Sequence, residues 1–397
     1  MNRTGKFAAV AILGTLSLTA CGGNEATKSA TSAAGSAASQ ATSAAGSAAS
    51  QATSAAAGGA AAADLACPAG SLKGEGSSAQ KTAMDELKKS YQDKCGNKGT
   101  IEYNPTGSGK GITNFNAKLV DWAGSDSALK SEKKDDGTIE TDAAKKRCGG
   151  NEAWNLPMVV GPVAFAYNVE GVEELILTPE ILSNIFAGKI NTWNDPAIAK
   201  VNPDAKLPGD KITVFYRSGE SGTTENVTKY LKAAAPAAFT AETGKKWPMK
   251  AGEGKDGSSG VAEAVKSTKG SISYMEWSYA QSNDLNIAQL DNGAGAVELS
   301  AEAVGKAIEG AEVKGKGNDL KLGLKYDIKE ADAYPAILVT YEIVCSKGLD
   351  AGKTALLKDY LTYMASDEGQ SQLEDAGYAP LPKSMQSKVQ EAIKAVA

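Results

Sequence analysis

Apolar residues in most of this chain follow two alternating patterns, compact runs typical of strands and three- or four-residue spacings typical of helices. The apolar runs predict strands at 72–73, 101–103, 120–124, 157–167, 212–216 and 337–344. Helical spacing follows in segments 79–94, 112–119, 227–231 and 356–363. Strands that alternate with helices indicate an α/β protein built on a mainly parallel sheet.

Three Gly- and Ser-rich loops each stand before a segment with helical spacing. They span residues 74–78, 106–111 and 217–223, and the third begins with Arg217. The start of a helix offers unpaired N–H donors and partial positive charge, and Ser and Thr are preferred there as caps. Ligands of parallel sheets bind at the carboxyl ends of strands, where these loops and Asp126 are expected. We therefore expect the loops to converge around a small oxyanion.

The first residues carry the signals of an exported lipoprotein. Arg3 and Lys6 precede an apolar stretch at 7–16 that is too short to span a bilayer and has the length of a secretory signal. The motif LTAC, which ends at Cys21, resembles the bacterial lipobox, and this implies cleavage before Cys21 and diacylglycerol on its sulfur. An ordinary signal peptide with an incidental cysteine is the alternative. We expect residues 1–20 to be removed and the mature chain to be lipid-anchored on the extracytoplasmic face of the cell membrane.

A low-complexity segment separates this signal from the rest of the chain. The sequence ATSAAGSAASQ at 30–40 is repeated at 41–51, and a third copy begins at residue 52. An 11-residue repeat can form a right-handed coiled coil, but no apolar residue larger than Ala is present to form its seam. Residues 21–66 are therefore predicted to be a lipidated cysteine followed by a disordered tether.

Composition restricts the kind of ligand and chemistry. The chain has 42 basic and 47 acidic residues, a net charge of −5, whereas nucleic-acid binders usually present a basic face. It contains no histidine, which excludes a Ser-His-Asp triad, and it has no Cys-x-x-Cys motif for zinc. We expect no nucleic acid, no metal, no cofactor and no enzymatic activity, and any attraction for an anion must be local.

The cysteines predict two disulfides. Without Cys21, the chain retains Cys67, Cys95, Cys148 and Cys345, an even number that allows three connectivities in an exported protein. Cys67 precedes the first strand and Cys95 ends the helix that returns beside it, which favours Cys67–Cys95 and leaves Cys148–Cys345. Buried free thiols are the alternative.

Each Gly-rich motif also has a competing interpretation. The spacing Gly74-x-Gly76-x-x-Ala79 fits a permissive dinucleotide fingerprint, but no clear second strand with an acidic residue follows. The run 109–111 resembles part of a P-loop, but no Ser or Thr follows its lysine. The run 219–223 resembles a nucleophile elbow without its final glycine. A capped turn explains any one such loop, and the combination with Arg217 and Asp126 favours an oxyanion site.

A longer set of motifs resembles a known family. The motifs lie at 74–78, 107–109, 124–126, 185–196, 202–208, 217–223 and 270–274, and the run KINTWNDP is the most specific. Together they resemble the PstS-type substrate-binding lipoproteins of bacterial Pst phosphate ABC transporters, and the extra cysteines resemble an actinobacterial branch. The likeness extends from about Leu72 to the C-terminus.

The resemblance implies a type II periplasmic-binding-protein fold, with two α/β lobes, a ligand cleft and a two-strand hinge. Residues 67–156 and 335–397 would form lobe 1, and residues 157–334 would form lobe 2. It implies a monomer that captures inorganic phosphate and delivers it to an ABC permease for import. A receptor for sulfate, molybdate or arsenate, and a surface phosphatase or adhesin, are the alternatives.

The resemblance also assigns the binding residues. Ser78 and Ser108 would each give an N–H and a hydroxyl, Ala79 would give an N–H, and Arg217 would make the charged contact. The start of a helix would surround the remaining oxygens with Ser221, Gly222 and Thr223. Asp126 would accept a hydrogen bond from the proton that phosphate keeps at neutral pH and sulfate lacks, so this carboxylate would favour phosphate.

The chain departs from the family pattern at three positions. Gly219 replaces an Asp that normally pairs with the arginine, Glu220 replaces a Gly, and Ala79 replaces a Phe that covers the ligand. Glu220 would either reach back to Arg217 or point to solvent.

Overall fold

The computed structural model describes residues 64–134 and 136–397. The predicted signal peptide, Cys21 and the predicted tether up to residue 63 lie outside the described residues. Among the helices of the described ranges, none combines the length and the apolar character that a membrane span requires.

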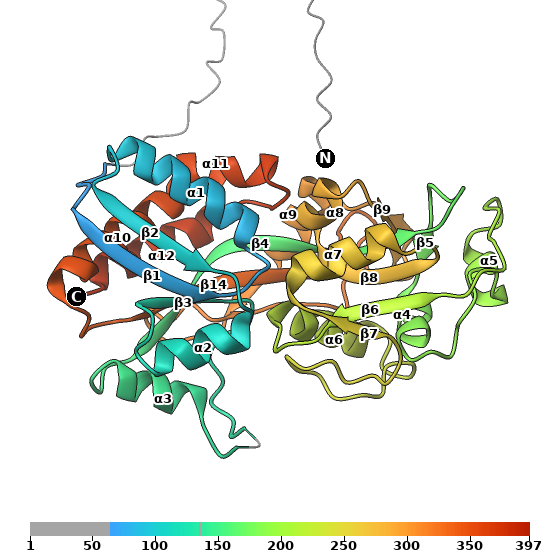
Figure 1. Ribbon diagram of the computed structural model, residues 1–397, viewed down its shortest axis with the longest axis horizontal. Coiled ribbons are helices and arrows are strands. Elements are labelled where there is room, and N and C mark those ends of the chain that lie inside the picture. Colours follow the sequence, from blue (N-terminus) through green and yellow to red (C-terminus); the bar gives the residue numbers. More distant parts are fainter. Residues whose placement is uncertain (1–63, 135) are drawn as a thin grey trace, which may run out of the picture. The chain divides into compact units, whose positions relative to one another are not determined.

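One continuous path of hydrogen-bonded strands organises the fold, in the order β2-β1-β3-β14-β4-β8-β6-β7 (Figure 1). Its members are β1 (Gly70–Gly76), β2 (Gly99–Asn104), β3 (Trp122–Ser125), β4 (Ala153–Asn168), β6 (Thr213–Arg217), β7 (Glu253–Lys255), β8 (Ser271–Glu276) and β14 (Ile337–Cys345), with β9 (Asn286–Ile287) paired to β4. Smaller sheets join β5 (Ile176–Leu177), β10 (Gln289–Asp291) and β11 (Ala296–Val297), and β12 (Glu312–Val313) with β13 (Leu322–Gly323).

The path consists of two outer groups of parallel strands joined by two long central strands. The first strand group is β1, β2 and β3, and the second strand group is β6, β7 and β8. The central strands β4 and β14 are antiparallel to each other and to their neighbours β8 and β3. The prediction of a mainly parallel sheet is therefore correct for the outer groups and wrong for the centre. The chain leaves the first strand group along β4 and returns along β14, so these two strands must run in opposite directions.

Helices cover the strands where the apolar spacing predicted them. In α1 (Lys81–Lys94), Met84, Leu87 and Tyr91 are buried, as their spacing indicated. The second predicted helix ends earlier than expected. Helix α2 covers only Ser108–Asn116, and Leu119 beyond its end is 66% exposed. The other helices are α3 (Glu140–Arg147), α4 (Pro179–Phe186), α5 (Pro196–Val201), α6 (Gly222–Ala234), α7 (Gly257–Ser267), α8 (Trp277–Ser282), α9 (Ala301–Glu309), α10 (Ala351–Met364), α11 (Asp367–Asp375) and α12 (Lys383–Ala395).

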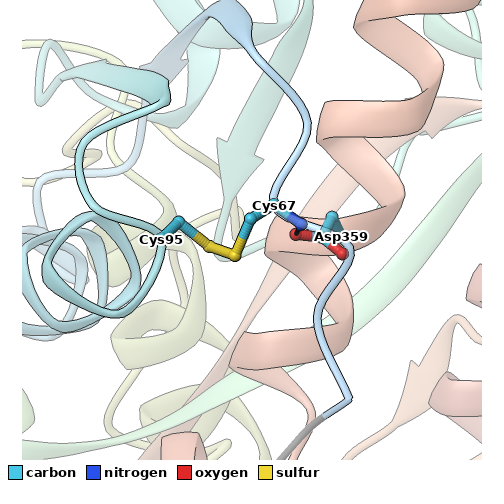
Figure 2. A group of neighbouring side chains, drawn as sticks. All are labelled: Cys67, Cys95 and Asp359. Atoms are coloured by element: carbon cyan, nitrogen blue, oxygen red, sulfur yellow. Dashed lines mark hydrogen bonds between the residues drawn. A yellow bond between two sulfur atoms is a disulfide. The ribbon is translucent and has the colours of Figure 1, made fainter.

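Two disulfides hold distant segments together, and both predicted pairings are confirmed. Cys67–Cys95 joins the segment before β1 to the end of α1, and Cys148–Cys345 joins the end of α3 to the end of β14. Figure 2 shows Asp359 of α10 beside Cys67. Its carboxylate accepts hydrogen bonds from the Cys67 N–H at 3.1 Å and the Tyr91 hydroxyl at 2.8 Å. The hydrogen bonds of Asp359 fasten the segment before β1 to α10. Because the two sulfurs are bonded to each other, they are not available as metal ligands.

Candidate functional site

Loops at the carboxyl ends of strands from both outer groups meet at one place. Ser78 follows β1, Ser108 begins α2 after β2, and Asp126 follows β3. From the second strand group, Arg217 ends β6 and Ser221 caps α6. Every one of these side chains is less than 5% exposed. The predicted convergence of the three Gly- and Ser-rich loops with Asp126 is confirmed.

The Asp126 carboxylate accepts three hydroxyl hydrogen bonds. Its Oδ1 accepts from Ser77 at 2.6 Å and from Thr340 of β14 at 2.7 Å, and its Oδ2 lies 3.2 Å from the Ser108 hydroxyl. Burial raises the pKa of Asp126 to about 6, and the charge of Glu276 adds to the rise, whereas the three hydroxyls lower it. Asp126 is therefore an ionised acceptor at neutral pH whose orientation is fixed from three sides.

The start of α6 lies directly against this carboxylate. A Cβ added at Gly222 would fall 2.5 Å from the Asp126 Cβ and 2.6 Å from the Ser108 Oγ, so no side chain fits there. Asn226, one turn later in α6, donates to the Asp126 carbonyl at 2.7 Å. The two strand groups thus meet through Gly222 and Asn226 on one side and the loop of Asp126 on the other.

Arg217 is a buried cation without a carboxylate partner. It is 4% exposed, its Nη1 donates to the Ser258 hydroxyl at 3.0 Å, and its Nε has no hydrogen-bond partner in the part of the chain that the structure describes. No carboxylate of residues 64–134 or 136–397 lies within 4.0 Å of it. A buried charge without a counterion raises the free energy of the folded protein, so a bound anion beside this guanidinium would be stabilising.

Glu220 does not reach back to Arg217, and its side chain is partly exposed to solvent, at 31%. Its side chain packs on Gly109, where an added Cβ would fall 2.4 Å from the Glu220 Cβ, and its carboxylate lies 3.8 Å from Lys134 and 3.7 Å from Lys246. Its carbonyl accepts a hydrogen bond from the Gly109 N–H at 3.1 Å. Glu220 therefore connects the loop after β6 to the loop after β2 and does not replace the missing partner of Arg217.

The start of α6 offers backbone donors more than hydroxyls. The Ser221 hydroxyl accepts from the Thr224 N–H at 3.2 Å, and the Ser221 N–H donates to the Lys245 carbonyl at 2.9 Å. The Thr223 hydroxyl donates to buried Glu276 at 2.5 Å. Because the first N–H groups of a helix have no intrahelical acceptor, Gly222 and Thr223 present their backbone donors here.

The loop after β1 is arranged around hydroxyls. The Ser78 Oγ lies 2.9 Å from the Ser258 Oγ, and the Ala79 N–H, which was expected to bind the ligand, donates to the Ser77 Oγ at 3.0 Å. The role assigned to Ala79 stays a prediction.

Sequence reasoning missed four residues of this site. Ser258 stands in a fourth Gly- and Ser-rich run, Asp256-Gly257-Ser258-Ser259-Gly260, which forms the N-cap and first residues of α7 and was a usable signal. Ser77 lies within a recognised loop, and Glu276 ends β8. Thr340 gives no local signal, since it is one polar residue inside an apolar strand and reaches Asp126 only through the pairing of β14 with β3.

Comparisons with known proteins identify the family. The PBP superfamily domain matches residues 44–368. The phosphate-binding protein PstS 3 of Mycobacterium tuberculosis is 41% identical over 82% of this chain and 87% of its own length. The phosphate-binding protein PstS 2 of the same organism is 37% identical over 99% of both chains.

The solved structures agree in fold. The phosphate-bound high-affinity periplasmic phosphate-binding protein PfluDING is 22% identical to this chain, with a TM-score of 0.66, and the match covers 81% of this chain and 93% of that protein. The expected type II periplasmic-binding-protein fold is confirmed. The chain belongs to the PBP superfamily and, within it, to the family of PstS phosphate-binding proteins.

Proposed function

We propose that this chain captures inorganic phosphate outside the cytoplasm and delivers it to the permease of an ABC importer. The observation that carries the proposal is Arg217, a buried cation with no carboxylate partner among the described residues, in a site that also holds the buried acceptor Asp126. A ligand that satisfies both must be an anion that still carries a hydrogen. Monohydrogen phosphate has this property and sulfate does not.

Each proposed contact has a distinct part in holding the ion. Arg217 would neutralise charge, while the hydroxyls of Ser78 and Ser221 and the N–H groups of Ser108, Gly222 and Thr223 would donate to the oxygens. The Ser108 hydroxyl would join them once its hydrogen leaves Asp126, and Ala79 would join once its N–H leaves Ser77. Charge-assisted hydrogen bonds in a buried site are strong, so a net negative protein can still bind a dianion. Asp126 accepts the ligand's proton, and sites of this kind can reject an analogue that lacks the hydrogen by ~10⁴-fold.

Capture would involve closure of two lobes about a hinge. Residues 67–156 with 335–397 would form one lobe and residues 157–334 the other. The long strands β4 and β14, which join the two strand groups, support this division, because they carry the chain across it. Hinge closure around a ligand is a common transition in periplasmic binding proteins.

Delivery would take place at the membrane without chemical turnover. The relatives are named as phosphate-binding proteins, which supports a binding role rather than an enzymatic one. Lipid on Cys21 would anchor a monomer on the extracytoplasmic face, and the Ala- and Ser-rich segment would allow it to reach the permease.

Isothermal titration of the purified chain with phosphate, arsenate and sulfate tests the proposal. Phosphate and arsenate should bind, and sulfate should bind at least 10³-fold more weakly, as roughly expected for a demanded hydrogen bond. Arg217→Met should abolish binding, whereas Lys269→Met, which removes the same charge at a 79% exposed position, should leave it unchanged. Tighter binding of sulfate or molybdate than of phosphate would contradict the assignment.

A further inference from the structure

The site is surrounded by four strand–loop–helix units, although the sequence motifs and the family pattern supply only three of them. From the first strand group, β1 leads to α1 and β2 to α2. From the second, β6 leads to α6 and β7 to α7, and β6 and β7 are parallel neighbours in which Arg217 pairs with Lys255. The fourth unit therefore ends beside the loop that carries Arg217.

We propose that the start of α7 is a fourth oxyanion-binding element, in which the hydroxyl and the backbone N–H of Ser258 contact the bound ion. This inference rests on the proposed function of the site. It adds a ligand contact on an element outside the residues that the family pattern assigns.

The contacts of Ser258 place it between two residues proposed to hold the ion. Ser258 is 2% exposed, and its Oγ lies 3.0 Å from the Arg217 Nη1 and 2.9 Å from the Ser78 Oγ. Its N–H points at the same Ser78 Oγ, at 3.4 Å. The Ser258 Oγ thus makes with Arg217 and Ser78 the contacts that an oxygen of the ion would make.

The first N–H groups of α7 do not donate to a capping side chain. Asp256 is its N-cap but makes no side-chain capping hydrogen bond, so the first N–H groups of this 11-residue helix are not satisfied by their own cap. Arg217 supplies an independent indication of a ligand, because its buried Nε has no partner within the described ranges. The positive end of the helix and the guanidinium therefore act on the same small volume.

The hydroxyls of Ser78 and Ser258 can rotate to donate to a new acceptor without any movement of the backbone. The Ser258 Oγ accepts from Arg217, so its own hydrogen is free to donate, and at present the two serine hydroxyls share a single hydrogen bond. A negatively charged oxygen beside them would draw both hydrogens, since charge-assisted hydrogen bonds are about twice as strong as neutral ones. Arg217 would then hold Ser258 in position while both serines donate to the ion.

Gly257 explains why the local sequence permits this arrangement. Its φ of +65° lies in the left-handed region, which residues with a side chain seldom adopt. The turn at Gly257 brings Ser258 into the site and leaves the next residue, Ser259, exposed. The exposed neighbour provides a matched control.

Titration of the full-length protein with phosphate tests the contact. Ser258→Ala should weaken phosphate binding about 10-fold or more, because it removes a hydrogen bond to a charged group. Ser259→Ala should bind like the wild type. Urea unfolding of the ligand-free variants checks that both remain folded.

The outcomes separate this proposal from the proposed function. If the wild type does not bind phosphate, the function itself fails. If the wild type binds and Ser258→Ala binds equally well or more tightly, the fourth element is refuted, because Ser258 would then be a spectator or a competitor for Arg217. A crystal structure of the phosphate complex with both the Oγ and the N of Ser258 more than about 3.5 Å from every ligand oxygen would refute it too.

Discussion

We predict that Asp126 determines how the proposed site responds to pH. Burial raises its pKa to about 6, so the carboxyl is ionised at pH 8 and mostly protonated at pH 5. A protonated Asp126 can donate to an oxygen that carries no hydrogen, so sulfate affinity should rise as the pH falls through 6. Asp126→Asn, whose amide always donates, should bind sulfate better relative to phosphate at pH 8 and lose this pH dependence. Sulfate titrations at pH 5 and pH 8 measure both effects, and equal wild-type affinities at the two values would refute the role of Asp126.

In the proposed site, ligand binding and stability should place opposite demands on Arg217. Because its charge is buried without a carboxylate, Arg217→Met should raise the free energy of unfolding of the ligand-free protein by about 1–3 kcal/mol while binding is lost. Urea unfolding without phosphate is the measurement. A clear loss of stability would show that the protein itself already compensates the charge.

Glu342 of β14 is a second buried carboxyl near the site, and its effect is on stability. Burial raises its pKa to about 8, and the charge of Asp126 adds to the rise, whereas Gln80 and Trp122 lower it. The folded protein holds this proton while the unfolded chain, with a pKa near 4.5, has released it, so stability falls as the pH rises towards 8.

Glu342→Gln removes this titration while it keeps the shape of the side chain. Between pH 6.5 and 8.5, above the pKa of Asp126, the wild type should lose about 2 kcal/mol that the variant retains. Urea unfolding at the two pH values measures the difference. Glu102→Gln, at an exposed position on β2, is the control and should follow the wild type.

At the scale of elements, the disulfides differ in how much chain they close. Cys67–Cys95 spans 28 residues and Cys148–Cys345 spans 197. Loop-closure entropy makes these bridges worth about 3.5 and about 5 kcal/mol, so replacement of the second pair by serine should cost more. Arg147 of α3 adds to the second region, since it donates to the carbonyls of Phe115, Val120 and Asp121. Urea unfolding of the two double variants gives the order, and the opposite order would contradict this account.

At the scale of the whole described unit, ion pairs join the two proposed lobes. Glu140 lies 3.2 Å from Lys245, with both side chains less than 10% exposed, and Lys130 lies 3.0 Å from Glu225. The Lys245 carbonyl also accepts the Ser221 N–H, so the residue that pairs across the two lobes also positions the loop at the start of α6. Closure of the lobes and formation of the phosphate site should therefore be coupled through Lys245.

Lys245→Met tests this coupling. Among the described residues, the variant leaves Glu140 with Lys134, 3.4 Å away, as its remaining ion-pair partner, so the closed form should be destabilised and phosphate affinity should fall about 10-fold or more. Lys246→Met removes the same charge from a 76% exposed neighbour and should have little effect. Titration measures the affinity, and small-angle scattering with and without phosphate measures closure. Equal affinities of the two variants would contradict the coupling.

Much of the fold and part of the site could be predicted, because the signals lie within a few neighbouring residues. Apolar spacing indicated α1, β4 and β14, and Gly- and Ser-rich loops indicated three of the helix starts around the site. The antiparallel centre of the sheet was missed, since strand direction depends on where the chain goes next and not on the composition of the strand. Thr340 was missed for the same reason, because it meets Asp126 across 214 positions of sequence.

The order of residues alone indicated what is encoded within a few neighbouring positions: the apolar spacing of the strands and helices, the capped Gly- and Ser-rich loops, and an even number of cysteines outside the predicted lipobox. Tertiary structure alone decided which of these groups are buried, that Arg217 has no counterion in the described part of the chain, and that Ser258, Thr340 and Lys245 reach across to the loops of other elements. The physical reason is that burial and long-range pairing arise only when the strands pack in order. The same residue can be a solvated side chain or a buried charge, depending on its neighbours in space.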